Sequence, residues 1–187
     1  TPVTISRNAA NTPYAIGFRA GSRVQLRHLV RAAAVRSSND AATAIAEAIS
    51  GSEAAFARRM NRTAVALGMT RTTFRNAHGL TADGHLSTAR DMTGMGRRLF
   101  YDYPQYFNFF GRVSTPAGPV GTVLNTNRAI LNNYRGADGI KTGFTRSAGF
   151  NLVSSAERGG VRILATVFGG RSAGSRNARI VELLDMC

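Results

Sequence analysis

Two extended runs near the C-terminus constrain the fold of this chain more than any other feature. Residues 149–156 and 161–169 are mostly apolar, and residues 157–160 (Glu-Arg-Gly-Gly) separate them. Paired glycines between two such runs favour a tight β-hairpin turn. The preceding stretch 138–145 (Asp-Gly-Ile-Lys-Thr-Gly-Phe-Thr) is expected to add a third strand. The last third of the chain is therefore predicted to form an antiparallel sheet, closed by a helix over residues 177–186.

Four stretches ahead of this sheet are predicted to be helices. They span residues 22–35, 41–49, 52–68 and 88–103, the last two counted with their capping residues. Ser52 and Thr88 are the expected N-caps of the third and fourth helices, and Asn39 or Asp40 caps the second. Gly51 is expected to end the second helix, because glycine adopts the left-handed conformation of a helix C-terminus without steric cost.

The remaining segments complete a single-domain prediction. Residues 3–6 are expected to form a short strand, residues 74–84 and 116–121 to form loops, and the aromatic patch 106–111 to pack inside the protein. No repeat or long linker divides the chain. The fold class is predicted to be α+β (mixed), one domain over residues 1–187. Its helical part covers about 22–110 and its sheet part about 136–187.

The charge of the chain indicates a polyanionic neighbour. The formal net charge is +14 at pH 7, and the arginines are spread from Arg7 to Arg179 without a long run. Nucleic acid, an anionic membrane face and an acidic cell-wall polymer could each supply the negative charge. No zinc-finger, RNP or basic-zipper pattern is present, so nucleic-acid binding is not expected.

The cysteine count and the hydropathy of the chain argue against several classes of protein. Cys187 is the only cysteine and the last residue, so neither an internal disulfide nor a cysteine cluster for zinc is expected. No run approaches the roughly 20 apolar residues of a membrane span. Residues 1–6 lack the basic and apolar regions of a signal peptide. The chain as it stands is expected to be soluble.

Lys141 is the residue on which the chemistry is expected to converge. The chain has 24 lysine and arginine residues, and Lys141 is the only lysine among them. Gly139 and Gly143 flank it closely, and glycine lets a ligand approach a strand backbone. Two other features stand out beside Lys141-Thr142-Gly143: the polar corner Ser37-Ser38-Asn39 between two predicted helices, and Arg176.

Together these features resemble the penicillin-binding, active-site-serine D-alanyl-D-alanine carboxypeptidases of bacterial cell walls, which are related to the serine β-lactamases. The similarity runs over nearly the whole chain. Further segments share it in the same order: Asn39-Asp40-Ala41-Ala42, Met60-Asn61, Leu67-Gly68-Met69, His78-Gly79-Leu80, Ser87-Thr88-Ala89 and Ala148-Gly149-Phe150-Asn151-Leu152. The resemblance implies the mixed fold of the β-lactamases and D,D-peptidases.

The resemblance also assigns catalytic roles. Ser37 would pass a proton to the leaving D-alanine, and Asn39 would hydrogen-bond the substrate backbone and the lysine of a Ser-x-x-Lys motif. Lys141 would keep the local field positive, which favours ionised hydroxyls and attracts a carboxylate.

Further residues would bind the substrate. The resemblance places Thr142 and Arg176 on the terminal carboxylate, with Gly143 beside them and the backbone N–H of Phe144 in the oxyanion hole. The implied substrate is a peptidoglycan stem peptide ending in D-Ala-D-Ala, and β-lactams are further ligands. No metal or other cofactor is implied. The implied location is periplasmic or extracytoplasmic in bacteria, and association with the membrane is a further expectation.

One departure from the family pattern is serious. A Ser-x-x-Lys nucleophile needs a serine three residues before a lysine, and the residue three before Lys141 is Asp138. We expect that the strands and nucleophile helix ahead of Thr1 have been removed, so this chain alone is predicted to be inactive and to form no covalent penicillin adduct. A sheet edge left unpaired by such a loss is expected to favour a dimer or a companion N-terminal fragment.

The sequence does not decide between several alternative functions. A serine-free relative that binds peptidoglycan without cutting it, and a D,D-endopeptidase using the same acyl-enzyme chemistry, fit the same motifs. A class A β-lactamase would need a Glu-x-x-Leu-Asn glutamate, and none of the glutamates has that context. A zinc peptidase is not expected either: His28 is predicted to pack within a helix and His78 to bond locally in a loop.

Overall fold

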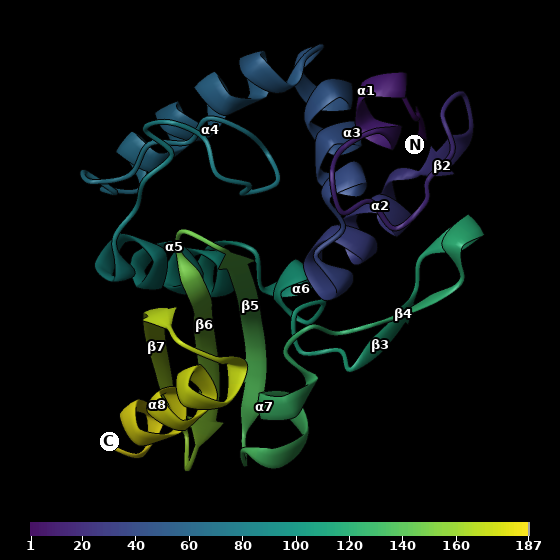
Figure 1. Cartoon of the computed structure of the whole chain (residues 1–187). Coiled ribbons are helices and arrows are strands. Elements are labelled where there is room, and N and C mark those ends of the chain that lie inside the picture. Colours follow the sequence, from purple (N-terminus) through teal and green to yellow (C-terminus); the bar gives the residue numbers. More distant parts are fainter. Residues whose placement is uncertain (187) are drawn as a thin grey trace.

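The computed structural model describes residues 1–186, in which a helical part and a three-stranded sheet lie next to each other (Figure 1). The expectation that Cys187 makes no disulfide lies outside the described residues. The helical part contains β1 (Pro2–Thr4), α1 (Arg7–Ala10), β2 (Arg23–Gln25), α2 (Leu26–Arg31), the π-helical turn η1 (Ala32–Arg36), α3 (Asn39–Ser50), α4 (Glu53–Ala66), α5 (Ala89–Asp102) and α6 (Pro104–Phe107). It is followed by β3 (Ser114–Pro116), the 3₁₀ turn η2 (Gly118–Val120), β4 (Thr122–Leu124), α7 (Arg128–Asn133), β5 (Ala137–Thr145), β6 (Gly149–Arg158), β7 (Val161–Gly170) and α8 (Ala173–Asp185). The mixed α+β class is confirmed.

The main sheet is the antiparallel meander that the sequence predicts. Its strand order is β5-β6-β7, so within residues 1–186 each outer strand has one unpaired edge. Leu152 on β6 packs with Ile180 and Leu184 of α8. The next residue, Val153, faces the other side, where it closely approaches Gly96 of α5. This alternation covers both faces of the sheet with helices and leaves the edge of β5 for a ligand.

The helical part has its own core. Phe18, Leu29 and Val35 are almost fully buried there and pack with the small residues of α3. The strands β1 and β2 pair antiparallel across Val3 and Val24, and the hairpin β3–β4 adds Val123 to the same cluster. This core holds the junction of η1 and α3, which carries Ser37.

Several predicted helix boundaries are confirmed. The side chain of Ser52 accepts a hydrogen bond from Ala55 N at 3.2 Å, and that of Thr88 accepts one from Asp91 N at 3.1 Å. Gly51 ends α3 in the left-handed conformation with φ of 79°. These ends depend on contacts within one turn of helix, which local sequence encodes.

Other boundaries were predicted wrongly because tertiary contacts decide them. Residues 23–25 form a strand instead of the first helical turn, since Val24 pairs with Val3. The N-cap of α3 is Ser38, neither Asn39 nor Asp40. The predicted loop 116–121 forms the turn of a hairpin, but the two short strands on either side of it, β3 and β4, were not predicted. The closing helix starts at Ala173, four residues earlier than predicted.

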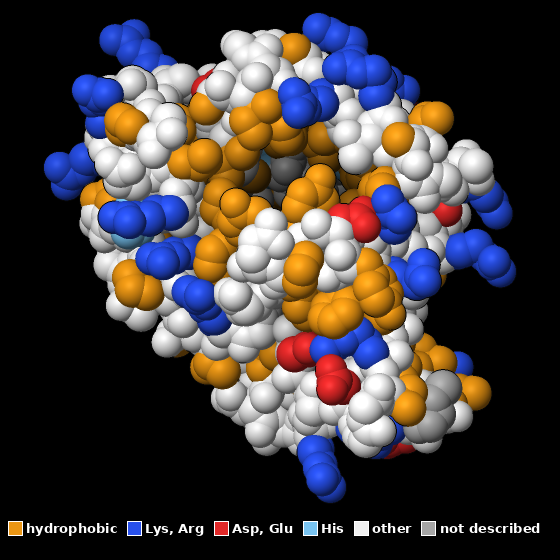
Figure 2. All heavy atoms as spheres, turned by 180° about the vertical axis from the view of Figure 1, so that it is seen from behind, with side chains coloured by type: hydrophobic (Ala, Val, Ile, Leu, Met, Phe, Trp, Pro, Cys, Tyr) orange, Lys and Arg blue, Asp and Glu red, His pale blue; other side chains and the backbone are white. Residues whose placement is uncertain are grey.

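The surface seen from behind shows how charge and apolar side chains are distributed. Lys and Arg side chains are scattered around the margin of this face, with few acidic side chains among them (Figure 2). Hydrophobic side chains rim a hollow in its upper half (Figure 2). Among residues 1–186, no helix has the length and apolarity needed to cross a membrane.

Candidate active site

Ser37 stands at the corner where η1 ends and α3 begins. Its φ is 65°, a left-handed conformation that few residues other than glycine adopt, and its backbone N–H bonds back to Ala32 O. Ser38 then caps α3 through its hydroxyl, which accepts from Ala41 N at 3.3 Å. The chain therefore turns sharply at Ser37 and presents its side chain outside both helices.

The carboxylate of Asp40 stabilises this corner through hydrogen bonds. The residue is fully buried. Its Oδ1 accepts from Ser38 Oγ and from Ala41 N. Its Oδ2 accepts from three consecutive backbone N–H groups of the segment before β2, those of Ile16, Gly17 and Phe18, at 3.1 to 3.2 Å. A buried carboxylate that accepts this many hydrogen bonds holds the two segments of the chain together.

Lys141 brings the sheet into contact with the corner. It lies on the edge strand β5, and its Nζ donates to Ser37 Oγ at 2.7 Å, a contact between residues 104 positions apart. Nζ also donates to Thr142 O at 2.9 Å. Burial lowers the pKa of Lys141 from 10.5 to about 8. The ammonium form therefore predominates at neutral pH, but it is held less firmly than in an exposed lysine.

Thr142 follows Lys141 on β5, and Arg176 lies on α8, which packs against the sheet. Thr142 Oγ1 is 2.6 Å from Thr126 Oγ1. Arg176, on α8, is 6% exposed, and its Nη1 donates to Asn151 O at 3.4 Å. Asn151 pairs with Gly143 in the β5–β6 register, so the guanidinium lies one strand in from the Lys-Thr-Gly segment. Burial lowers the pKa of Arg176.

The other two predicted residues have different surroundings. The side-chain amide of Asn39 bonds to another segment: its Nδ2 donates to Pro13 O at 2.8 Å. Phe144 is 55% exposed on β5, with its ring centroid 4.4 Å from that of Phe150. Within residues 1–186, a hydrogen bond joins Lys141 directly to Ser37, and no described hydrogen bond joins Arg176 to Lys141 or Thr142.

Thr126 is a functional candidate that the sequence reasoning missed. Its N–H donates to Val35 O at 3.1 Å, just before Ser37, while its hydroxyl contacts Thr142. Asn125 and Asn127 on either side are almost fully buried. Three polar residues directly after an apolar strand were the available signal, because buried polar side chains need specific partners.

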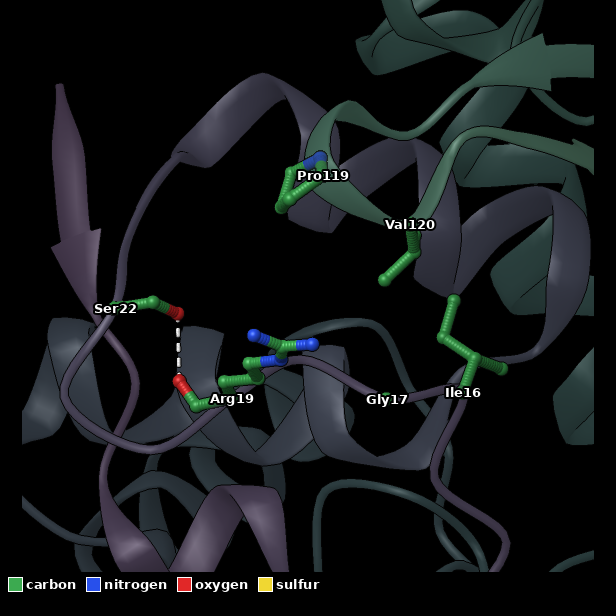
Figure 3. Close-up of a pocket in the computed structure, with 6 residues that line it drawn as sticks. All are labelled: Ile16, Gly17, Arg19, Ser22, Pro119 and Val120. Atoms are coloured by element: carbon green, nitrogen blue, oxygen red, sulfur yellow. Dashed lines mark hydrogen bonds between the residues drawn. The ribbon is translucent and has the colours of Figure 1, made fainter.

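Two hollows lie outside the contact between Ser37 and Lys141. One of about 500 Å³ lies between the segment before β2 and the tip of the β3–β4 hairpin, where Arg19 points between Pro119 and Val120 (Figure 3). The other, of about 530 Å³, lies at the end of the sheet beyond Phe144. Ser37 and Lys141 line neither of them. The candidate active site is thus an open strand edge beside a helix corner.

The histidines occupy structural positions. His78 Nδ1 accepts from Leu80 N at 3.2 Å, and its Nε2 lies 3.3 Å from Glu53 Oε1. His28 packs beneath Gly118 at the hairpin tip. In the part of the chain that the structure describes, no group of three or more His, Cys, Asp or Glu residues is placed to hold a metal ion.

Solved structures share this architecture. The crystal structure of the D-alanyl-D-alanine carboxypeptidase DacD from Francisella tularensis matches with a TM-score of 0.92 and 31% identity, over 99% of this chain and 57% of that one. Penicillin-Binding Protein D2 from Listeria monocytogenes, in its ampicillin-bound form, matches with a TM-score of 0.87 and 31% identity, over 99% and 75%. The fold is therefore that of the penicillin-binding D,D-peptidases.

The sequence comparison narrows this class. The family model for D-alanyl-D-alanine carboxypeptidases matches residues 1–172. D-alanyl-D-alanine carboxypeptidase DacF of Bacillus subtilis is 38% identical over 169 residues, which are 88% of this chain and 43% of that protein. The chain belongs to the D-alanyl-D-alanine carboxypeptidase family, and it spans less than half the length of this relative.

Proposed function

We propose that this chain supplies the proton relay and the carboxylate-binding groups of a serine-type D-alanyl-D-alanine carboxypeptidase. The reaction would remove the terminal D-alanine of a peptidoglycan stem peptide through an acyl-enzyme. The observation that carries the proposal is the 2.7 Å hydrogen bond from Lys141 Nζ to Ser37 Oγ. It joins the two motifs that the family resemblance assigns to one site.

The direction of this hydrogen bond suits Ser37 to proton transfer. An ammonium group can only donate, so Ser37 Oγ accepts from Lys141 and its own hydroxyl hydrogen points elsewhere. That hydrogen is free to move toward a leaving amine on the open side of the corner. The adjacent positive charge makes the hydroxyl more acidic and so eases the transfer.

Lys141, Thr142 and Arg176 would select a chain end. A carboxypeptidase must distinguish a free terminal carboxylate from an internal peptide bond, and positive charge with hydroxyl donors makes that distinction. Lys141 contacts Ser37 directly, Thr142 follows it on the same strand, and the Arg176 guanidinium lies one strand away. Their combined field would hold a D-alanine carboxylate against the edge of β5.

The nucleophile would come from outside these residues. The only lysine is Lys141, and Asp138 stands three positions before it, so the 187 residues contain no Ser-x-x-Lys. We therefore expect the isolated chain to bind substrate without turning it over. A peptide or β-lactam would be held noncovalently, and labelled penicillin would leave no band on a denaturing gel.

Two further partners belong to the same proposal. Peptidoglycan and β-lactams lie outside the bacterial cytoplasm, so we place the protein in the periplasm or another extracytoplasmic space. The net charge of +14 would bring it to an anionic membrane face or wall polymer. The unpaired outer edges of β5 and β7 could each pair with a second copy or a companion fragment.

A matched pair of peptides tests the proposal. One ends in a free D-Ala-D-Ala carboxylate, and the other has the same sequence with an amidated C-terminus. We expect the chain to bind the free acid at least about tenfold more tightly by titration calorimetry, because only the acid engages the positive groups. The substitution Lys141→Met should remove this preference.

The control variant is Arg128→Gln, which removes one exposed positive charge of α7. It should leave the preference for the free acid intact. Equal binding of acid and amide by the unmodified chain would contradict the proposed function.

A further inference from the structure

A hollow of about 530 Å³ lies where β5 turns into β6 and where β7 runs into α8. Its lining residues come from these two turns: Phe144, Arg146, Ser147, Ala148, Gly149, Phe150, Gly169, Gly170 and Arg171. The rings of Phe144 and Phe150 form an apolar wall, with centroids 4.4 Å apart. The hollow begins two residues beyond Thr142, so it continues the candidate active site along the strand.

Positive charge in this hollow is uncompensated. Arg146 and Arg171 are both exposed, and no hydrogen bond or ion pair is described for either within residues 1–186. Among the described residues that line the hollow, none is acidic. An apolar wall beside two free guanidinium groups suits a ligand that combines an aliphatic stem with a carboxylate.

The turn that carries Arg146 is held in place. Thr145 Oγ1 accepts from Ala148 N at 3.0 Å and lies 3.2 Å from Ser147 Oγ. Ser147 Oγ also lies 3.0 Å from Thr81 Oγ1 of the loop between α4 and α5. The backbone of the turn is therefore ordered before any ligand arrives, which lowers the entropic cost of binding.

Glycine keeps the floor of the hollow open. A Cβ at Gly149 would lie 2.9 Å from Gly170 O, and a Cβ at Gly170 would lie 2.9 Å from the Cβ of Arg176. Larger residues could not occupy these positions without displacing the strands. The close approach also brings Arg176 beneath the floor, so it adds to the positive field.

The register of β5 relates the hollow to a bound peptide. A peptide that pairs antiparallel with the free edge of β5, with its last residue opposite Thr142, places its third residue from the C-terminus opposite Phe144. The separation is about 7 Å at roughly 3.4 Å per residue. Directly opposite residues share a face of the sheet, so an L side chain at that position meets the Phe144 wall.

We infer that this hollow is a specificity subsite for a side-chain carboxylate on the third residue from the end of the D-Ala-D-Ala peptide. The inference rests on the proposed function and names the substrate it prefers. The aliphatic stem of that residue packs on Phe144 and Phe150, and its carboxylate reaches Arg146 and Arg171. The amidated form of the same side chain keeps the packing and loses the charge interaction.

Two peptides that both end in free D-Ala-D-Ala test this subsite. They differ only in the side chain of the third residue from the end, which carries either a carboxylate or the matching carboxamide. We expect the chain to bind the carboxylate peptide about threefold to tenfold more tightly by titration calorimetry. The double variant Arg146→Gln/Arg171→Gln should bring this ratio to about one while leaving the affinity for the carboxamide peptide unchanged.

The control is Arg58→Gln/Arg59→Gln, which removes the same charge from α4, outside the hollow. It should keep the full ratio. A ratio of one in the unmodified chain, or a ratio that survives the Arg146/Arg171 double variant, overturns the subsite. If the preference for a free C-terminal carboxylate persists in either case, the proposed function stands without it. If neither peptide binds, both the subsite and the proposed function are wrong.

Discussion

Lys141 carries a half-buried positive charge, and removing such a charge from water is unfavourable to folding. The ammonium is enclosed between β5 and the Ser37 corner, and burial lowers its pKa to about 8. A residue that only stabilised the fold would be better replaced by an apolar side chain, since burying a charge is unfavourable. Under the proposed function, a carboxylate ligand would need this charge, which would account for its presence.

The pH dependence of stability reports this buried charge. The pKa of Lys141 is about 8 in the folded chain and 10.5 in the unfolded chain, so between these values the unfolded chain binds more protons. The free energy of unfolding should therefore rise with pH across this interval, by up to about 3 kcal/mol from this group. Below pH 8 both states are protonated and the penalty is fully present.

The substitution Lys141→Met isolates the effect, because every other titrating group is common to both proteins. Urea unfolding of the two proteins from pH 8 to pH 10.5 should show wild type gaining stability relative to the variant. A difference in unfolding free energy that stays constant over this interval would show that the ammonium is solvated.

At the scale of elements, Asp40 joins the segment before β2 to the start of α3. Its two oxygens accept from the backbone of 16–18, from Ser38 and from Ala41. Asp40→Ala would leave several buried N–H groups without a partner, so we expect a loss of about 3 kcal/mol or more in urea unfolding. Because the same carboxylate positions Ser37, peptide binding should weaken as well.

The comparison for this prediction is Asp102→Ala. Asp102 forms an exposed i,i+4 ion pair with Arg98 at 2.9 Å, and its removal should cost about 0.5 kcal/mol or less. Similar losses for the two variants would mean that the Asp40 contacts do not hold the corner.

Arg162 holds the start of β5 to the rest of the sheet. From β7 it donates to Asp138 Oδ2 and to Glu157 Oε2, each at 2.7 Å, and its guanidinium lies 3.9 Å from the centroid of Phe100. Asp138 is three residues before Lys141. These contacts of Arg162 therefore hold α5, β6 and β7 to β5, the strand that carries Lys141.

Replacing Arg162 should loosen β5. We expect Arg162→Gln to destabilise the fold by about 2 to 4 kcal/mol and to speed hydrogen exchange at Ile140 and Lys141. Arg162→Lys should recover less than half of the loss, because an ammonium cannot bond two carboxylates in a fixed plane. Arg179→Gln, at an exposed pair with Glu182, is the control and should change neither quantity. Unchanged hydrogen exchange at Ile140 and Lys141 in Arg162→Gln would show that the Arg162 contacts do not hold the part of β5 that carries Lys141.

At the scale of the whole molecule, the charge of +14 is distributed rather than focused. Figure 2 shows basic side chains around the margin of one face without a single dense patch. A spread of arginines favours weak attraction to an extended anionic surface over recognition of one partner. Such attraction would concentrate the protein near the polymeric substrate that we propose for it.

Salt tests this electrostatic attraction. We expect cosedimentation with vesicles rich in anionic lipid at low ionic strength, and a steep loss of binding as the Debye length falls to about 8 Å near physiological salt. Vesicles of neutral lipid are the control and should bind little at any salt concentration. Binding that does not respond to salt would rule out a charge-driven partner.

Features that depend on neighbours along the chain could be predicted from local sequence. The caps at Ser52 and Thr88, the helix end at Gly51 and the meander of β5, β6 and β7 follow from turn chemistry and periodicity within a few residues. The family resemblance placed Lys141 and Ser37 in one site, but the hydrogen bond between them and the bond from Asn39 to Pro13 appear only in the folded structure. Local patterns carry no information about which distant segments meet, because that depends on the packing of the two cores and the register of the strands between them.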